Sequence, residues 1–182
     1  MKNRTVAALL AVFAMAFAGL SFAQNPMVGG HDMSPQKNIV ENALNSNDHT
    51  TLVAAVKAAG LVDTLEGPGP FTVFAPTNEA FAKLPAGAVD TLLKPENKDQ
   101  LTKVLTYHVV AGKMTSTDLK KKIKEGHGTA ELTTVQGEKL EAMMQGSNIV
   151  LKDAKGGTAT VTIPNVMQSN GVIHVIDSVL LP

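Results

Sequence analysis

Cysteine is absent from the 182-residue sequence, which excludes disulfide bonds, thiol nucleophiles and thiolate metal ligands. Arginine occurs once, at Arg4, so the chain has almost none of the planar side chains that bind phosphates and guanine edges in two-pronged fashion. Sixteen Lys and Arg residues balance sixteen Asp and Glu residues, for a formal net charge of zero. Proteins that bind nucleic acids carry an excess of positive charge, so we expect no nucleic-acid partner.

The first 23 residues predict a secretory signal peptide. A short basic region with Lys2 and Arg4 precedes an uncharged apolar run over residues 6–20, and Ser21-Phe22-Ala23 is a small-x-small cleavage site. The run of about 15 residues is shorter than the roughly 20 that span a bilayer, which favours cleavage after Ala23 over an uncleaved anchor. Cleavage leaves 14 basic and 16 acidic residues, a net charge of −2. We expect a secreted protein, periplasmic or extracellular, without a membrane span.

Residues 24–36 contain two prolines and two glycines without hydrophobic periodicity, and we interpret them as a flexible leader. No internal repeat divides the rest, so residues 37–182 are expected to form one domain. Met27, His31 and Met33 lie in the leader, and thioethers beside an imidazole are ligands that copper accepts. A tail that merely contains these residues is the simpler interpretation. A periplasmic copper or small-ligand binding protein is the alternative.

Seven segments have the hydrophobic spacing of short helices. They cover 38–44, Thr50 or Thr51 to Ala59, 61–65, 77–84, 88–93, Pro95 to Tyr107, and one of Thr115, Ser116 or Thr117 to Lys124. The last segment carries four lysines, Lys120, Lys121, Lys122 and Lys124. Such a run is either an ordinary solvated helix face or a surface for acidic polysaccharide or lipid.

The stretch that begins at Phe71 predicts a strand that turns directly into a helix. Phe71 and Phe74 point to opposite faces of the strand, because its side chains alternate. Pro76 ends the strand since it has no N–H to donate, and the hydroxyl of Thr77 is placed to cap the helix. Phe81 lies on the apolar face of that helix. We interpret this stretch as a packing corner of the core, without catalytic chemistry.

From residue 129 the hydrophobic period changes to two, and glycine-containing turns separate the segments. The strands that we expect cover residues 130–135, 139–144, 149–151, 158–163 and 172–180. Asn170-Gly171 is a strong turn signal before the last strand. That strand is apolar on both faces apart from His174 and Asp177, so we place it centrally and expect His174 to be a hydrogen-bonded core histidine.

Sequence motifs of common catalytic and cofactor sites are missing. There is no serine nucleophile elbow, phosphate-binding glycine loop, paired-histidine zinc helix or calcium loop. His108 follows Tyr107, the only tyrosine, and an imidazole can act as a base near neutral pH. A partly buried histidine bonded to a backbone or carboxylate group is the simpler interpretation. We expect no enzymatic activity and no cofactor.

Three ordered motifs resemble the fasciclin domain, in particular its small secreted bacterial members. They are Phe71–Phe81, the Tyr107-His108 pair and the closing stretch Asn170–Pro182, and together they span most of residues 38–182. The resemblance implies an α+β fold in which a bundle of short helices packs on a seven-stranded wedge of two sheets. It also implies an adhesion and protein-interaction module with a protein or glycan partner at a cell surface or in a matrix.

The resemblance further assigns roles to individual residues. In animal members the region of the Tyr-His pair is linked to integrin engagement, which makes Tyr107 and His108 candidate interaction residues. The other motif residues are expected to be structural: Phe71, Phe74, Pro76, Thr77, Phe81, Asn170, Gly171 and His174.

Overall fold

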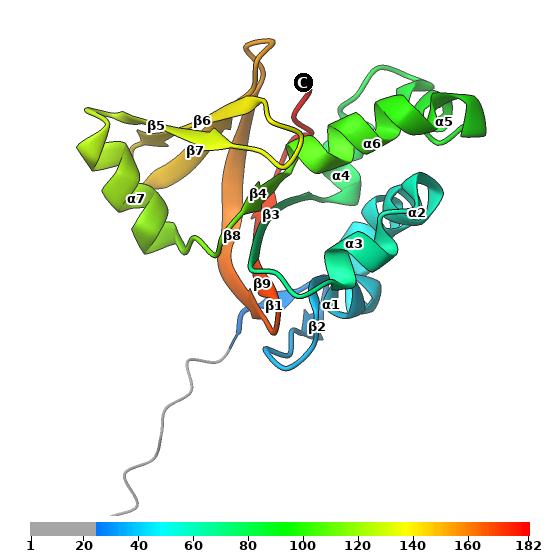
Figure 1. Cartoon of the computed structure of the whole chain (residues 1–182), viewed down its shortest axis with the longest axis horizontal. Helices are drawn as coiled ribbons and strands as arrows, with labels where there is room; N and C mark the ends of the chain where they lie inside the picture. The colour runs from blue at the N-terminus through cyan, green and yellow to red at the C-terminus, as the bar shows by residue number, and fades with distance from the viewer. Residues whose placement is uncertain (1–24) are drawn as a thin grey trace, which may run out of the picture.

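The structure is a computed structural model that describes residues 25–182 (Figure 1). The predicted signal peptide, residues 1–23, and its cleavage site after Ala23 lie outside the described residues. Within the described part, no helix has the length and apolar character needed to cross a membrane. Short helices and a seven-stranded sheet make up an α+β fold, as predicted.

All seven segments with helical spacing are helices. They are α1 (Ile39–Asn45), α2 (Thr50–Ala59), α3 (Val62–Glu66), α4 (Asn78–Ala82), α5 (Ala88–Leu92), α6 (Lys98–Tyr107) and α7 (Ser116–Glu125). Single 3-10 turns over Asn47–His49 and Pro95–Asn97 lead into α2 and α6. The predicted ends agree with these bounds to within one turn of helix.

The main sheet has seven strands: β3 (Phe71–Pro76), β4 (Val109–Ala111), β5 (Thr129–Thr133), β6 (Lys139–Gln145), β7 (Asn148–Lys152), β8 (Thr158–Gln168) and β9 (Gly171–Ile176). Their order is β4-β3-β9-β8-β7-β6-β5, and only β3 and β9 are parallel. The long strand β8 joins the two halves of this sheet, since it pairs with β9 on one side and with β7 on the other. The Val135 N–H donates to the Val109 carbonyl at 2.8 Å, so the edges of the wedge nearly meet, as in a barrel.

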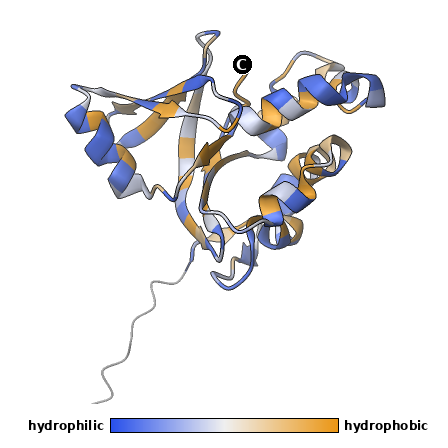
Figure 2. Ribbon diagram, viewed as in Figure 1, coloured by the Kyte–Doolittle hydropathy of each residue, from blue (hydrophilic) through white to orange (hydrophobic). Residues whose placement is uncertain are grey.

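The apolar side chains form two cores on opposite faces of β3. The ribbon shows α7 on one side of the sheet and the other helices on the opposite side (Figures 1 and 2). Val73 and Ala75 belong to the core between the sheet and helices α1–α6, which we call the helix-side core. Phe74 belongs to the core between the sheet and α7, the sheet-side core. This is the alternation that the sequence of β3 predicts. Every residue of β9 is buried, so the central position predicted for the closing strand is confirmed.

The corner between β3 and α4 forms as predicted. β3 ends at Pro76, and Oγ1 of Thr77 accepts a hydrogen bond from the Ala80 N–H at 3.2 Å. Phe81 is 6% exposed and packs in the helix-side core. The cap therefore positions α4 so that its phenylalanine reaches the core.

The start of α2 is capped by a side chain from another helix and not by Thr50 or Thr51, the residues at which the sequence places its start. The Thr51 N–H donates to Oδ1 of Asn78 at 3.0 Å, and Nδ2 of Asn78 donates to the Asn47 carbonyl at 2.9 Å. Asn78 lies in the first turn of α4. One side-chain amide thus satisfies backbone groups at the start of α2 that its own sequence leaves free.

Residues 25–36 are not the flexible leader that the sequence predicts. β1 (Met27–Val28) pairs with β2 (His31–Asp32) in a short hairpin. Val28 and Met33 are 4% and 5% exposed and belong to the helix-side core. Two apolar anchors are too few to produce a hydrophobic period, which is why the pattern suggests a loop. The folded domain therefore begins before residue 37.

Asn25 fixes this hairpin to the sheet. Its Nδ2 donates to the Met167 carbonyl at 2.7 Å, and its Oδ1 accepts from the Met167 N–H at 2.9 Å. The side-chain amide thereby imitates one backbone rung on the edge of β8.

Three of the differences from the predicted strands, at β4, β8 and β9, exceed one or two residues at an end or add a whole strand. β4 was not predicted, because its three residues are too few to show a period of two. β8 continues past Pro164 to Gln168 with register shifts on either side, which accommodate a residue without an N–H. β9 ends at Ile176, and the next residue, Asp177, bonds to Thr160 of β8 through both its backbone N–H, at 3.2 Å, and its carboxylate, at 2.8 Å.

Replacing Phe81 by Ala is expected to lower the free energy of unfolding by roughly 3–5 kcal/mol, because it leaves a cavity in the helix-side core. Urea denaturation of the purified protein measures this loss. Leu44→Ala is the control, since Leu44 is 52% exposed on α1 and its truncation should cost less than about 1 kcal/mol. Similar losses for both variants would show that Phe81 is not a core residue.

Candidate functional site

The Tyr107-His108 pair, a candidate interaction site by resemblance, lies inside the protein. The two residues stand at the end of α6, just before β4, and are 0% and 2% exposed. Side chains so deeply buried cannot contact a partner while the fold is closed. The prediction of an interaction role for this pair is therefore wrong for direct contact, and its hydrogen bonds indicate a structural role instead.

The Tyr107 hydroxyl joins three segments. It donates to the Lys139 carbonyl at 2.9 Å and accepts from the Ala154 N–H at 3.1 Å. It thereby connects α6 with the start of β6 and with the turn between β7 and β8. Burial raises the pKa of Tyr107, so the hydroxyl remains protonated and able to donate at neutral pH.

Both ring nitrogens of His108 are occupied. Nδ1 donates to the Val104 carbonyl at 2.7 Å, and Nε2 accepts from the Leu180 N–H at 3.0 Å, since a carbonyl can only accept and an N–H can only donate. Burial lowers the pKa of His108 to about 4, against weaker opposing effects of the Val104 carbonyl and the Asp153 charge. Neither nitrogen is free to take a proton from a substrate. The geometry is that of a backbone-bonded histidine, not of a catalytic base.

Asp153 completes the attachment of the C-terminal segment, a role that the sequence reasoning missed. Its Oδ2 accepts from the Leu181 N–H at 3.0 Å, next to the residue that His108 binds. Its Oδ1 accepts from the N–H groups of Lys155 at 3.0 Å and Gly157 at 2.7 Å. An aspartate followed three residues later by a Gly-Gly pair is typical of such a side-chain-bonded turn, and this was the available signal.

His174 is the hydrogen-bonded core histidine that the sequence predicts. It is 0% exposed, its Nε2 donates to the Met114 carbonyl at 2.8 Å, and its Nδ1 accepts from the Asn165 N–H at 3.3 Å. Its ring stacks on Phe74, with ring centroids 5.7 Å apart. Burial lowers its pKa, and the Met114 carbonyl only partly opposes this effect. His174 therefore holds the segment before α7 against the central strands.

The Asn170-Gly171 turn is also structural. Oδ1 of Asn170 accepts from the Ile39 N–H at 3.1 Å, and Nδ2 donates to the Leu65 carbonyl at 2.7 Å, which connects the start of α1 with α3. A Cβ on Gly171 would lie 2.1 Å from the Phe71 carbonyl oxygen. Only glycine therefore fits where β9 meets β3.

The three copper candidates do not form a common site. Met33 is 5% exposed in the helix-side core, whereas Met27 is 58% exposed on β1. His31 is exposed, and its Nε2 lies 3.2 Å from Nδ2 of Asn47. Residues 25–182 contain no group of three or more His, Asp or Glu side chains placed to hold a metal ion.

The lysines of α7 form an exposed charged face. Leu119 and Ile123 are 0% and 2% exposed and fix the helix against the sheet, so the other positions point outward (Figures 1 and 2). Five exposed lysines on α7 and in the loop before it make up what we call the lysine face: Lys113, Lys120, Lys121, Lys122 and Lys124. Within the described chain, only Lys121 among them is in an ion pair, with Glu125 at 3.9 Å. The lysine face thus offers positive charge that the described part of the chain does not neutralise.

The buried histidines predict that the protein loses stability in acid. The pKa of His108 is about 4 in the folded protein against a reference value of 6.5, so only the unfolded chain binds a proton between these pH values. The stabilisation is complete above about pH 6.5, and roughly 3 kcal/mol is lost by about pH 4. His49 and His174, whose pKa values burial also lowers, add to the loss. Urea denaturation at a series of pH values measures how the free energy of unfolding changes with pH, and we call this change per pH unit the pH slope.

In His108→Gln, the slope between about pH 6 and 4.5 is expected to fall by about 1.4 kcal/mol per pH unit, the value for one proton. His31→Gln, at an exposed position on the hairpin, is the matched control and should retain the original slope. An unchanged pH slope in His108→Gln would contradict the conclusion that the lowered pKa of His108 makes the stability depend on pH.

Comparisons with known proteins agree with this architecture. The sequence profile of the Fasciclin domain matches residues 47–182. Protein sll1483 of Synechocystis is 51% identical over 144 residues, which are 79% of this chain and 73% of that protein. Immunogenic protein MPB70 of Mycobacterium bovis is 40% identical over 145 residues, 77% of this chain and 66% of that protein.

A solved structure shares the fold. The FAS1 domain pair from the insect cell adhesion molecule fasciclin I superposes with a TM-score of 0.72 at 22% sequence identity, over 80% of this chain and 51% of that one. The profile match over most of the chain, together with relatives of this identity, shows that the chain belongs to the fasciclin domain family.

Proposed function

We propose that the protein is an exported, non-enzymatic adhesion module that binds an acidic glycan through the lysine face of α7. Membership of the fasciclin family supports the adhesion role, since the insect protein that shares the fold is named as a cell adhesion molecule. The predicted signal peptide supports export to the periplasm or the cell surface.

The observation that carries the proposal is the contrast between the motif residues and α7. Tyr107, His108 and His174 are buried and bonded to backbone groups, so they support the scaffold. The lysine face is exposed, and most of it lies on α7, a helix whose N-terminus is capped by side chains of its own sequence. Oγ1 of Thr115 accepts from the Asp118 N–H at 3.3 Å while Oδ2 of Asp118 accepts from the Thr115 N–H at 2.9 Å, a complete capping box.

The chemistry of the lysine face favours an acidic polysaccharide over a single small anion. Lysine ammonium groups are flexible point charges that bind repeated carboxylate or sulfate groups without requiring one fixed geometry. Four of the five lysines lie within one stretch of α7, from Lys120 to Lys124, and such a dense series of charges matches a polymer whose charges also repeat. Such binding weakens as salt rises, because both sets of charges are exposed and screened.

Reversing the charge of Lys120, Lys121 and Lys124 to Glu is expected to weaken binding to alginate, a polyuronate, by about tenfold or more, since each exposed ion pair contributes up to about 1 kcal/mol. Affinity chromatography or calorimetry at several salt concentrations measures the loss, and the unmodified protein should elute at higher salt.

The matched control reverses three exposed lysines on and beside α6, Lys94, Lys98 and Lys103, which changes the net charge equally. If this control lowers the affinity as much as the α7 variant does, the lysine face is not the binding surface. The protein could also bind intact cells in a way that neither added alginate nor the charge reversal on α7 weakens. That result would indicate a protein partner instead of a glycan.

A further inference from the structure

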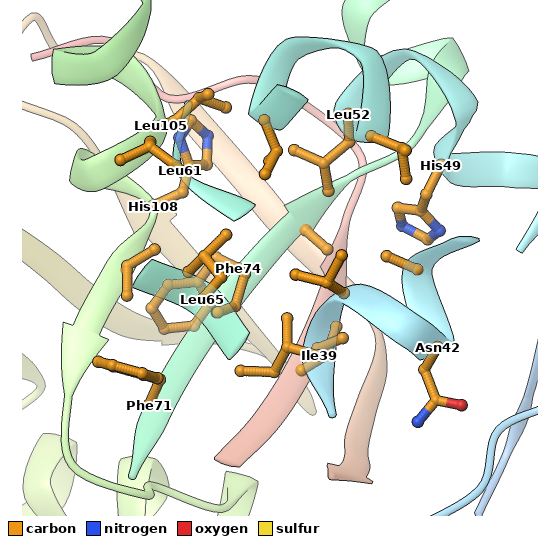
Figure 3. A pocket seen from close by; sticks show the side chains of 18 of the residues that line it. Ile39, Asn42, His49, Leu52, Leu61, Leu65, Phe71, Phe74, Leu105 and His108 are labelled. Carbon is orange, nitrogen blue, oxygen red and sulfur yellow. The ribbon is translucent and has the colours of Figure 1, made fainter. Parts of the chain in front are cut away.

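The helix-side core contains a cavity of about 70 Å³ between α1, α2, α3 and strand β3. Apolar side chains form most of its wall, and Figure 3 shows Ile39, Leu52 and Leu65 arranged around the same space. The buried part of the β1–β2 segment, with Val28 and Met33, closes one end. The cavity is unrelated to the lysine face of α7, which lies on the other side of the sheet.

One polar atom in this wall has no partner. His49 is 3% exposed and lines the cavity, and its Nε2 makes no hydrogen bond to any described residue. Its Nδ1 lies 2.8 Å from Oγ of Ser46, and this contact holds the ring that Figure 3 shows beside the cavity. The Ala75 backbone opposes the lowering of the pKa of His49 by burial, but the distance and angle required for a hydrogen bond to Nε2 are not met.

The other buried polar side chains of the wall are fully used. The amide of Asn42 accepts from the Ser34 N–H at 3.0 Å and donates to the Ser34 carbonyl at 2.7 Å, and it also donates to Gln168. Both nitrogens of His108 are bonded. Since buried polar groups in folded proteins are almost always paired, the free Nε2 of His49 indicates that the cavity receives a hydrogen-bonding group from outside the chain.

The exposed members of the wall show where such a molecule enters. Lys57 and Thr64 are exposed, Leu61 is half-buried, and Val135 is 45% exposed. The mouth therefore lies beside α3, away from the hairpin. Leu61 and Val135 form the apolar part of this mouth, which admits an alkyl group, whereas Lys57 and Thr64 are its polar members.

We propose that this cavity binds a small aliphatic molecule with one hydroxyl group, or the hydroxyl-bearing alkyl end of a larger one, and that the hydroxyl bonds to Nε2 of His49. A hydroxyl both donates and accepts, so it matches either tautomer of the imidazole. The size favours an alkyl chain of a few carbons, because the cavity has about half the roughly 150 Å³ of an apolar cavity that holds benzene.

The test compares 1-butanol with 1-chlorobutane, which has a similar chain but no hydroxyl. Titrations followed through the methyl NMR signals of the purified protein are expected to show saturable shifts at Ile39, Leu52 and Leu65 with both probes. In His49→Leu, the affinity for butanol relative to chlorobutane is expected to fall by about two- to tenfold, the factor that one hydrogen bond supplies. His49→Phe gives the same readout if the leucine variant does not fold.

Two variants that replace an alanine by leucine test whether the probes bind in this cavity. Ala43→Leu fills the cavity, since Ala43 lines it, and should abolish binding of both probes. Ala54→Leu is the matched control at an exposed position of α2 outside the wall, and should leave both affinities unchanged. The proposal is overturned if butanol leaves the cavity methyl signals unmoved, or if the ratio of the two affinities is the same with and without the His49 imidazole. Either result would mean that a water molecule satisfies Nε2.

Discussion

The parallel pairing of β3 with β9 is the constraint on which the other packing depends. These strands are one hundred residues apart in the sequence and run in register from the Phe71–Gly171 pair to the Pro76–Ile176 pair. A parallel pair cannot be closed by a tight turn, so the intervening chain must travel from one end of β3 back to the start of β9. Because both strands are apolar on both faces, each face needs its own cover. The helices before and after β3 cover one face, and α7 with the late hairpins covers the other.

Buried polar side chains connect the segments that the sheet does not pair. Tyr107, His108, Asp153 and His174 all bond to backbone groups of distant segments. Hydrogen bonds of this kind contribute about 1 kcal/mol each, but removing one partner leaves a buried donor or acceptor unpaired, which costs about 1–3 kcal/mol. A chain without cysteine has no covalent cross-link to hold its C-terminal segment. His108 and Asp153 hold Leu180 and Leu181 there through two adjacent N–H groups instead.

The sequence predicts features whose signals are local. The cap at Thr77, the alternation of β3, the seven helices and the central position of β9 follow from residues that are neighbours in the chain. Features that depend on a distant partner were missed. Asn78 caps α2 from another helix, Asn25 imitates a rung on β8, and β4 becomes a strand only because β3 lies beside it. The unpaired nitrogen of His49 likewise depends on segments that are distant in the sequence and meet around the cavity, so no pattern within the sequence indicates it.

The burial of the Tyr-His pair explains why a family signature can be strong while the partner stays unspecified. The signature residues determine how β3, α6 and β9 fit together. Their phenylalanines pack in the two cores, and their polar members bond to backbone groups, which every sequence supplies. A partner meets only exposed side chains, and the five lysines on and beside α7 lie between the second and third signature motifs. Their replacement by other polar residues would leave both cores and all the buried hydrogen bonds intact. Two proteins with the same signature can therefore share this fold and still differ in charge on α7, so that recognition must be inferred from the surface of each chain separately.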